Sequence, residues 1–460
     1  MPPAGDVPEL VQRSLLPEPA DVVFAWHARP GALERLLAPW QPARVVERSG
    51  HGVDAGARVV LAVGPGPLAL RWEARHDRCV VGREFRDVQV AGPFAEWTHV
   101  HRFVPDGPDR CVLEDQVTYR LPLAPIAAPL VGAWVDGQLR RMFAFRHART
   151  REDLARHRAA GGPPLRVAVT GATGFLGRAL CAFLTTGGHG VVRVGRGARG
   201  PDAVAWDPAR GTIDAAGLAA VDAVVHLAGA PVATRWTPAS KRAIRESRVA
   251  GTRLLAETLA RLPRPPRVLV SASAVGWYGS AGDAPLDESA PPGGGFLAEV
   301  CRDWEAATAP AAAAGIRVVH ARIGVVLGAQ GGALARLLTP FRLGVGGVVG
   351  SGRQVTSWIA LDDAVYALHH LVRSESVGGA VNLTAPHAVT NAELTRTLAR
   401  VLRRPAVLPL PASVVRALLG EMAQAVVLEG ARVTPGALLA SGYRFLHPEL
   451  ESALRAELGR

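Results

Sequence analysis

The chain has 460 residues, of which 48% are hydrophobic and 20% are charged, and its formal net charge is +12. This length exceeds one ordinary domain, and the composition is that of a globular protein rather than a disordered chain. Lys241 is the only lysine, so the positive charge is almost entirely arginine, spread along the chain without a nucleic-acid-binding motif. We therefore expect two or three domains and no nucleic-acid partner.

Cysteine usage and hydropathy limit the compartment. The four cysteines lie far apart with no Cys-x-x-Cys pair, which argues against a disulfide framework or a metal knuckle and fits a reducing compartment. The longest apolar stretch, "LPLAPIAAPLVGAWV", is short and broken by prolines, and no signal-peptide pattern is found. We predict a cytoplasmic protein with no metal and no membrane span.

The first 160 residues alternate polar and hydrophobic side chains as antiparallel strands do. Short helices are predicted after Pro19, and 126–156 predicts one long amphipathic helix. In "EWTHVHRF", His99 and His101 share a face, either as acid/base groups or as half-buried side chains. We favour half-burial, because no carboxylate at a fixed spacing accompanies them. Beyond "LALRWEARH" and "EWTHVHRF", strands are predicted at 8–15, 43–49, 56–63, 82–91 and 110–120.

The segment "RHRAAGGPPLR" interrupts this pattern with two glycines and two prolines. We place a domain boundary there. The predicted organisation is a first domain over 1–158, a linker over 159–164 and a second domain over 165–460.

A glycine-rich turn opens the second domain in "LRVAVTGATGFLGRALCAFLTTGGHGVVRVGR". An apolar strand at 165–170 leads into the turn, and a helix and a second apolar strand at 191–195 follow it. This context predicts a dinucleotide-binding turn, because the glycines admit the pyrophosphate and the helix N-terminus supplies free N–H groups. The predicted cofactor-binding residues of the turn are Gly171, Thr173, Gly174, Phe175, Leu176 and Gly177.

The residues after the second strand indicate which nucleotide binds. Sites for NAD place an acidic residue there to hold the ribose hydroxyl, but this chain has no acid before Asp202. Arg196 would instead attract a 2′-phosphate. The sequence therefore favours NADP(H) over NAD(H).

Two later apolar strands end in small or polar residues. The segment "VDAVVHLAGAP" places Leu227, Ala228 and Gly229 beside the cofactor, and 265–279 runs into Ser271, a further predicted cofactor contact, and on to Ser273 and Tyr278. Strands that alternate with helices in this way specify a doubly wound parallel sheet with ligands at the carboxyl ends of the strands. The predicted fold class is therefore a Rossmann-type α/β domain, preceded by an α+β domain.

Both halves resemble known families. "VFAWHARPGALERLLAPW", "GREFRDVQVAGPFAEWTHVHRF" and "RRMFAFRHARTREDL" resemble the helix-grip superfamily of START-like and polyketide-cyclase-like proteins, which implies a hydrophobic ligand. "HLAGAPVATRWTPASKRAIRESRVAGTR", "SASAVGWYGSAGDAPLDE" and "RIGVVLGAQGGALARLLTPFRLGVGGVVGSGRQVTSWIALDD" resemble an atypical, epimerase-family or cell-division-inhibitor-like branch of the extended short-chain dehydrogenases/reductases. That resemblance covers 165–460 and implies a C-terminal substrate lobe.

The chain departs from that superfamily at the catalytic pair. The resemblance implies that Ser273 is the superfamily's serine, but "FLAEVCRDWE" stands where Tyr-x-x-x-Lys is expected, and Arg248 replaces an asparagine. We predict an NADP(H)-dependent oxidoreductase or epimerase-like enzyme with a small-molecule substrate; the alternative is a non-catalytic NADP(H) sensor. The candidate catalytic residues are Ser273 and Tyr278, Arg248 is a candidate cofactor contact, and the candidate substrate contacts are Glu299, Arg353 and Trp358.

Overall fold

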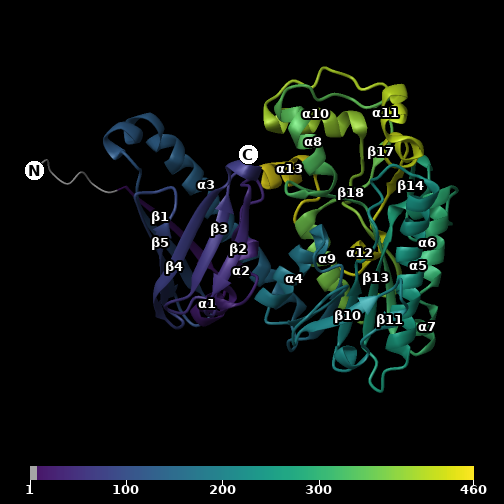
Figure 1. Ribbon diagram of the computed structural model, residues 1–460, viewed down its shortest axis with the longest axis horizontal. Helices are drawn as coiled ribbons and strands as arrows, with labels where there is room; N and C mark the ends of the chain where they lie inside the picture. The colour runs from purple at the N-terminus through teal and green to yellow at the C-terminus, as the bar shows by residue number, and fades with distance from the viewer. Residues whose placement is uncertain (1–7) are drawn as a thin grey trace, which may run out of the picture. The chain divides into compact units, whose positions relative to one another are not determined.

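The computed structural model describes residues 8–460, except for the side chains of 124–130. The chain forms two compact units that divide between Gly162 and Pro163. Figure 1 shows their elements in chain order from purple to yellow. In the part of the chain that is described, no helix is long and apolar enough to cross a membrane.

The first unit is a seven-stranded antiparallel sheet with three helices. The strand order is β1-β7-β6-β5-β4-β3-β2. The strands predicted at 8–15, 43–49, 56–63, 82–91 and 110–120 each begin and end within two residues of an observed strand. The predicted long helix corresponds to α3. The elements are β1 (Glu9–Leu16), α1 (Ala20–Ala28), α2 (Ala32–Leu36), β2 (Ala43–Ser49), β3 (Arg58–Val63), β4 (Leu70–Val80), β5 (Glu84–Ala91), β6 (Glu96–Pro105), β7 (Cys111–Arg120) and α3 (Ala124–Ala160).

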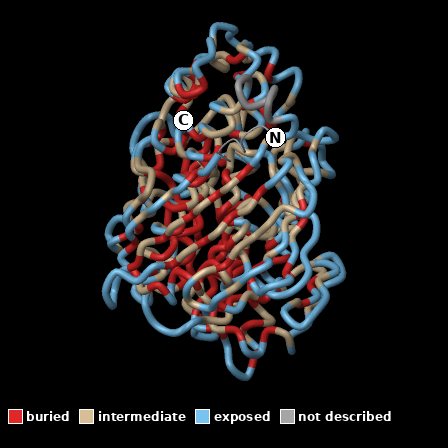
Figure 2. The backbone as a smooth tube through the Cα atoms, turned by 90° about the vertical axis from the view of Figure 1, so that its left-hand side faces the viewer, coloured by how far each residue is buried: buried red, intermediate tan, exposed pale blue. Residues whose placement is uncertain are grey.

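Burial in this sheet follows the pleat. Along β6 the residues Trp97, His99, His101 and Phe103 are buried, whereas those between them are more exposed. In Figure 2 the buried positions gather in the interior of the trace and the exposed positions lie mainly on its outer turns. Apolar side chains from the sheet, α1 and α3 form the core, as expected for a helix-grip fold. Polar side chains nevertheless lie within this interior, because His99 and His101 occupy inward positions.

The second unit is built on an eight-stranded sheet in the order β11-β10-β9-β8-β12-β13-β15-β19. All its neighbouring pairs are parallel except β10 with β11. The order reverses between β8 and β12, which makes the carboxyl ends of these strands the switch point where ligands bind in such sheets. The strands are β8 (Arg166–Thr170), β9 (Gly190–Gly195), β10 (Ala203–Asp207), β11 (Thr212–Ile213), β12 (Ala223–His226), β13 (Val268–Ala274), β15 (Arg317–Ile323) and β19 (Gly379–Leu383).

Helices cover both faces of this sheet. Val167 and Val169 pack into one core with α4 and α9, whereas Ala168 packs into a second core with α5 on the other face. Strands buried on both faces explain the uninterrupted apolar runs in the sequence. The predicted Rossmann-type class is confirmed. The helices are α4 (Phe175–Thr186), α5 (Pro238–Ala260), α6 (Phe296–Ala306), α7 (Ala309–Ala313) and α9 (Leu361–Arg373).

The remaining elements of the second unit include a smaller lobe with its own apolar core. Trp358, which the sequence placed beside a substrate cleft, is fully buried in this core, and its indole N–H donates to the His387 carbonyl at 2.9 Å. That prediction was wrong, because Trp358 packs inside the lobe. The elements are β14 (Gly282–Leu286), β16 (Val325–Gly328), α8 (Gly332–Arg342), β17 (Val355–Thr356), β18 (Trp358–Ala360), β20 (Val389–Thr390), α10 (Asn391–Leu402), α11 (Ala412–Leu419), β21 (Ala431–Val433), α12 (Gly436–Ala440) and α13 (Leu450–Leu458).

Candidate nucleotide-binding site

The glycine-rich turn lies directly after β8, at the switch point. Gly171 has a φ of +68°, and a Cβ there would come within 2.9 Å of the Leu227 carbonyl carbon. A Cβ on Gly177 would overlap the carbonyl oxygen of Gly171, and the Gly174 N–H donates to that oxygen at 2.9 Å. Each position therefore requires a glycine, because the turn, the end of β12 and the start of α4 approach one another at backbone distance. This is the close backbone cradle that a pyrophosphate needs.

A buried polar chain holds the β12 end against this turn. The Thr170 hydroxyl oxygen accepts hydrogen bonds from the N–H groups of Leu227, at 3.1 Å, and Ala228, at 3.2 Å. Its other partner is Nδ1 of His226, at 2.7 Å, and Nε2 of His226 lies 2.9 Å from the Thr252 hydroxyl. Burial lowers the pKa of His226 to about 4, so the ring is neutral at pH 7 and can connect two hydroxyls.

Arg196 follows β9 immediately, and its side chain is exposed. Asp202, the next acidic residue, lies 3.6 Å from the guanidinium of Arg166. The end of β9 thus carries an exposed positive charge in the position where NAD sites carry a carboxylate.

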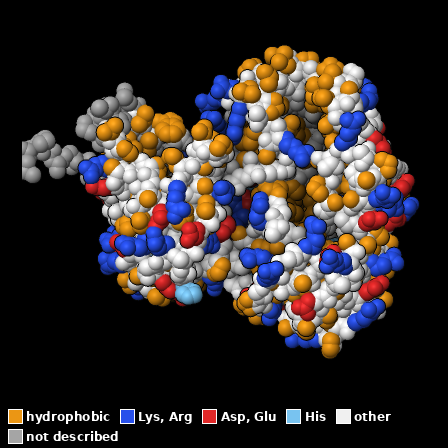
Figure 3. Space-filling model, viewed as in Figure 1, with side chains coloured by type: hydrophobic (Ala, Val, Ile, Leu, Met, Phe, Trp, Pro, Cys, Tyr) orange, Lys and Arg blue, Asp and Glu red, His pale blue; other side chains and the backbone are white. Residues whose placement is uncertain are grey.

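The aromatic residue of the turn contacts the smaller lobe. The ring of Phe175 lies against Gly328 and Gly331, where any Cβ would collide with it. Figure 3 shows a hollow on this face of the second unit, between the part that carries α8 and the part that carries α4, with hydrophobic side chains along it. The loop after β16 and the nucleotide turn therefore constrain each other's position.

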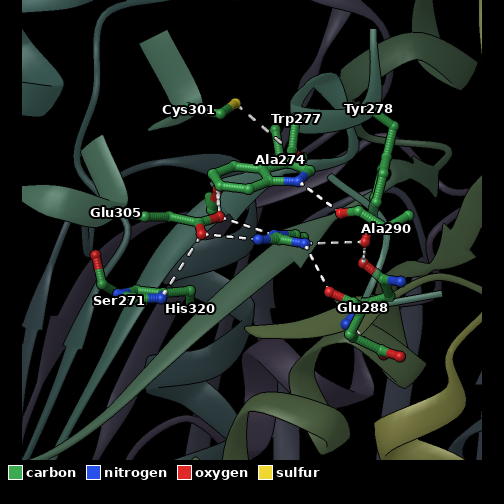
Figure 4. A network of polar contacts seen from close by, with 12 residues as sticks. Ser271, Ala274, Trp277, Tyr278, Glu288, Ala290, Cys301, Glu305 and His320 are labelled. Atoms are coloured by element: carbon green, nitrogen blue, oxygen red, sulfur yellow. Dashed lines mark hydrogen bonds and ion pairs between the residues drawn. The ribbon is translucent and has the colours of Figure 1, made fainter. Parts of the chain in front are cut away.

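A second polar network lies further along the carboxyl ends of β13, β15 and β19 (Figure 4). Ser273, Arg322 and Asn382 are neighbours across these three strands. The Ser273 hydroxyl donates to Oε1 of Glu305 at 2.6 Å, and Arg322 holds both oxygens of Glu305, at 2.9 and 3.0 Å. Ser273, Glu305 and Arg322 are all buried. The hydroxyl proton of Ser273 is therefore directed at a carboxylate of the protein.

Tyr278 belongs to the same network. It is 2% exposed, and its hydroxyl donates to Oδ1 of Asn382 at 2.7 Å while accepting from Nη1 of Arg322 at 3.1 Å. Burial raises the pKa of Tyr278, although the hydrogen bond from Arg322 acts in the opposite direction. The Arg322 guanidinium also lies 3.8 Å from the centroid of the Trp277 ring (Figure 4). Both candidate catalytic hydroxyls thus belong to one buried, hydrogen-bonded cluster.

The other predicted site residues are dispersed. Ser271 pairs with His226 across β12 and β13. However, Ser271 is only 1% exposed, and its hydroxyl donates to the Ala272 carbonyl. Arg248 does reach the β12 loop: it donates to the Ala230 carbonyl at 3.0 Å, and its guanidinium faces Gly229. Arg353 is exposed on a loop of the smaller lobe.

The atypical helix α6 presents no free acid or thiolate to the sheet. Glu299 is exposed and pairs with Arg245 at 3.0 Å. The buried Cys301 thiol donates to the Ala274 carbonyl, and burial raises its pKa to about 11. Glu305 and Arg322 could not be predicted from the sequence, because nothing local links these residues to Ser273.

The sheet, its switch point and the glycine turn define the class: a Rossmann-type α/β protein with a dinucleotide-binding fingerprint. Residues 167–384 match the NAD dependent epimerase/dehydratase family, 410–457 match a domain of unknown function, and 16–145 match the family described as polyketide cyclase/dehydrase and lipid transport. An epimerase family protein of Mycobacterium bovis is 43% identical over 290 residues, which are 63% of this chain and 96% of that protein. The chain belongs to the epimerase family.

Solved structures agree with this assignment. The nucleoside-diphosphate sugar epimerase from Corynebacterium glutamicum is 35% identical with a TM-score of 0.80, covering 98% of this chain and 90% of that one. The human epimerase family protein SDR39U1 (isoform 2), solved with NADPH, is 37% identical with a TM-score of 0.59, covering 64% of this chain and 99% of that one. The first similarity includes both units, whereas the second covers a length close to that of the Rossmann-type unit alone.

Proposed function

We propose that the second unit binds NADP(H) and that the protein is an NADP(H)-dependent oxidoreductase or epimerase-like enzyme acting on a small molecule. The observation that carries this proposal is the glycine cradle at the switch point, where a Cβ on Gly171 or Gly177 would collide with backbone. The solved human relative that contains NADPH supports the same reading.

Residues around the glycine turn match the charged groups of the cofactor. The N–H groups at the start of α4 would hold the pyrophosphate, and Arg196 would pair with the 2′-phosphate. Leu227 and Ala228, which follow β12, lie beside the turn and are held there by Thr170, and Gly229 comes next in the chain. When bound, the nicotinamide supplies or accepts a hydride. Arg248 contributes a positive charge close to this loop, where it can stabilise negative charge on a substrate.

Within this proposal, Ser273 and Tyr278 position the carboxyl ends of the strands. Their hydroxyls bind Glu305, Asn382 and Arg322 in a buried cluster, which keeps β13, β15 and β19 in register beside the cofactor. Tyr278→Phe removes two hydrogen bonds and no charge. We therefore expect this variant to lose stability and to keep any hydride transfer.

One observation favours a second function, an NADP(H)-binding sensor without chemistry. A reductase needs a proton donor beside the hydride acceptor, and the two hydroxyls expected to serve are both buried and bonded to other side chains. The helix-grip unit would then bind a hydrophobic ligand and report on it together with the redox state of the nucleotide pool.

Isotope transfer separates the two functions. The purified full chain is incubated with a metabolite extract and NADPH deuterated at its transferable position, with Tyr278→Phe alongside, and the products are analysed by mass spectrometry. Deuterium in a metabolite identifies an enzyme and the class of its substrate. Tight NADPH binding without label transfer across varied extracts would contradict a net NADPH-dependent reductase and favour the sensor.

A further inference from the structure

The interior of the first unit contains a cluster of titratable side chains that the nucleotide site does not use. Asp87 on β5 lies opposite His99 on β6, and His101 on β6 lies opposite Asp115 on β7. His147 reaches the same cluster from α3. The three histidines and Asp115 are buried, and the Asp87 side chain is only 14% exposed.

Three of these side chains point donor atoms at one another. Oδ1 of Asp87 lies 3.2 Å from Nδ1 of His99 and 3.7 Å from Nε2 of His101, and all three atoms lie within 4.8 Å of one another. Ligand atoms that share one tetrahedral cation at 2.0–2.1 Å are separated by about 3.3 Å. The donor atoms therefore already lie close to the spacing of a coordination sphere.

The opposite side of both rings faces one carboxylate. Oδ1 of Asp115 lies 2.9 Å from Nε2 of His99 and 2.6 Å from Nδ1 of His101, and Oδ2 lies 2.7 Å from Nε2 of His147. Histidines that bind a metal usually donate their second ring N–H to a carboxylate, which fixes the tautomer and the ring orientation. Asp115 is placed to do this for His99, and its Oδ1 also lies close to Nδ1 of His101. The remaining nitrogen of each ring then offers a lone pair towards Asp87.

The hydrogen bonding of the buried His101 ring is incomplete. Its Nδ1 is buried without an aligned hydrogen bond despite the short distance to Asp115, and its Nε2 is too far from Asp87 for one. A buried ring left in this state requires an explanation, and an ion is one of the few available.

We propose that Asp87, His99 and His101 bind one divalent first-row transition cation, with Asp115 orienting the two rings. Two imidazole nitrogens and one carboxylate oxygen suit zinc, iron(II) or cobalt(II) and leave at least one coordination position for water or for an oxygen atom of a bound molecule. Phe85 stacks on His101 with ring centroids 4.1 Å apart, and Phe143 packs edge-on to His99. These apolar neighbours would keep bulk water from the site. This inference differs from the sequence-based expectation of no metal, and it does not depend on the nucleotide.

The test uses the full chain after treatment with a chelator. Zinc and cobalt(II) are titrated separately, with calorimetry for both, elemental analysis for bound zinc, and visible absorption for cobalt. We expect one cation per chain in this site and a cobalt spectrum typical of nitrogen and oxygen ligands. Asp115→Asn should weaken binding by about 10–100-fold. His99→Gln, His101→Gln and Asp87→Asn, which each remove a ligand, should weaken it more.

Matched histidine substitutions control for adventitious binding. His51 is exposed in the same unit, and His189 is a buried histidine of the second unit. His51→Gln and His189→Gln should both keep the cation and its cobalt spectrum. Circular dichroism without metal shows whether each ligand variant folds, and any one folded ligand variant suffices. The proposal is overturned if wild type binds no cation, or if folded ligand variants bind it as tightly as wild type.

Discussion

Replacing Glu305 by glutamine tests the buried cluster beside the nucleotide site. Arg322 is 4% exposed in its side chain and Glu305 is 8% exposed, and the two form a bidentate ion pair at 2.9 and 3.0 Å. Ser273 donates to the same carboxylate. Glu305→Gln keeps the volume of the side chain and one acceptor oxygen, but it leaves the Arg322 charge buried without its counter-charge.

The size of the effect follows from burial. Removing one partner of a buried ion pair costs about 3–5 kcal/mol, because the remaining charge stays desolvated. Glutamine retains one hydrogen bond to Arg322, and Tyr278 still accepts another, so we expect a loss of about 3 kcal/mol in the free energy of unfolding. Glu299→Gln on the same helix is the matched control. Its ion pair with Arg245 is between side chains that are 52% and 38% exposed, so its loss should cost about 0–1 kcal/mol.

Urea unfolding followed by tryptophan fluorescence measures both variants, since Trp277 packs on Arg322 and reports on the cluster. A loss below about 1 kcal/mol for Glu305→Gln, or equal losses for both variants, would refute the reasoning. Such a result would mean that water or rearrangement neutralises the Arg322 charge, and that the cluster does not fix the strand ends.

Further predictions concern the glycine turn and the buried His226. Gly177→Ala should abolish NADPH binding and lower the melting temperature, because its Cβ overlaps the Gly171 carbonyl; Gly137→Ala, in open space on α3, should instead leave NADPH binding unchanged. The pKa of His226 falls from 6.5 unfolded to about 4 folded, so the unfolded state binds more protons between these values and stability falls as the pH drops through that window. The free energy of unfolding should be about 2 kcal/mol lower at pH 5 than at pH 7 because of His226. Urea titrations at both pH values should show that His226→Gln lacks this contribution. A variant whose free energy of unfolding depends on pH as steeply as that of wild type would contradict this prediction.

The sequence predicted what depends on local pattern. The turn from Gly171 to Gly177 sits between a strand and a helix within one short segment, so spacing alone identifies it. The alternation in β6 likewise placed His99 and His101 on one face.

Contacts between residues that are far apart in the sequence could not be predicted from local pattern. The carboxylates beside these histidines were missed because Asp87 and Asp115 come from neighbouring strands, and strand register is not visible in local spacing. The Arg322–Glu305 ion pair was missed for a related reason, because it joins strand β15 to helix α6 and local spacing does not show this contact. Trp358 was misplaced because a buried tryptophan in a short strand has the same local sequence as one that lines a cleft.

The central claim is that the glycine turn and Arg196 together bind NADP(H). Calorimetric titration of wild type, Arg196→Ala and Arg210→Ala with NADPH and with NADH tests it most directly; Arg210 is a comparable exposed arginine after β10. We expect wild type to prefer NADPH, Arg196→Ala to bind NADPH about 10-fold more weakly while its affinity for NADH stays unchanged, and Arg210→Ala to change neither affinity. Equal affinity of wild type for the two nucleotides, or an Arg196→Ala variant that retains the preference, would contradict it.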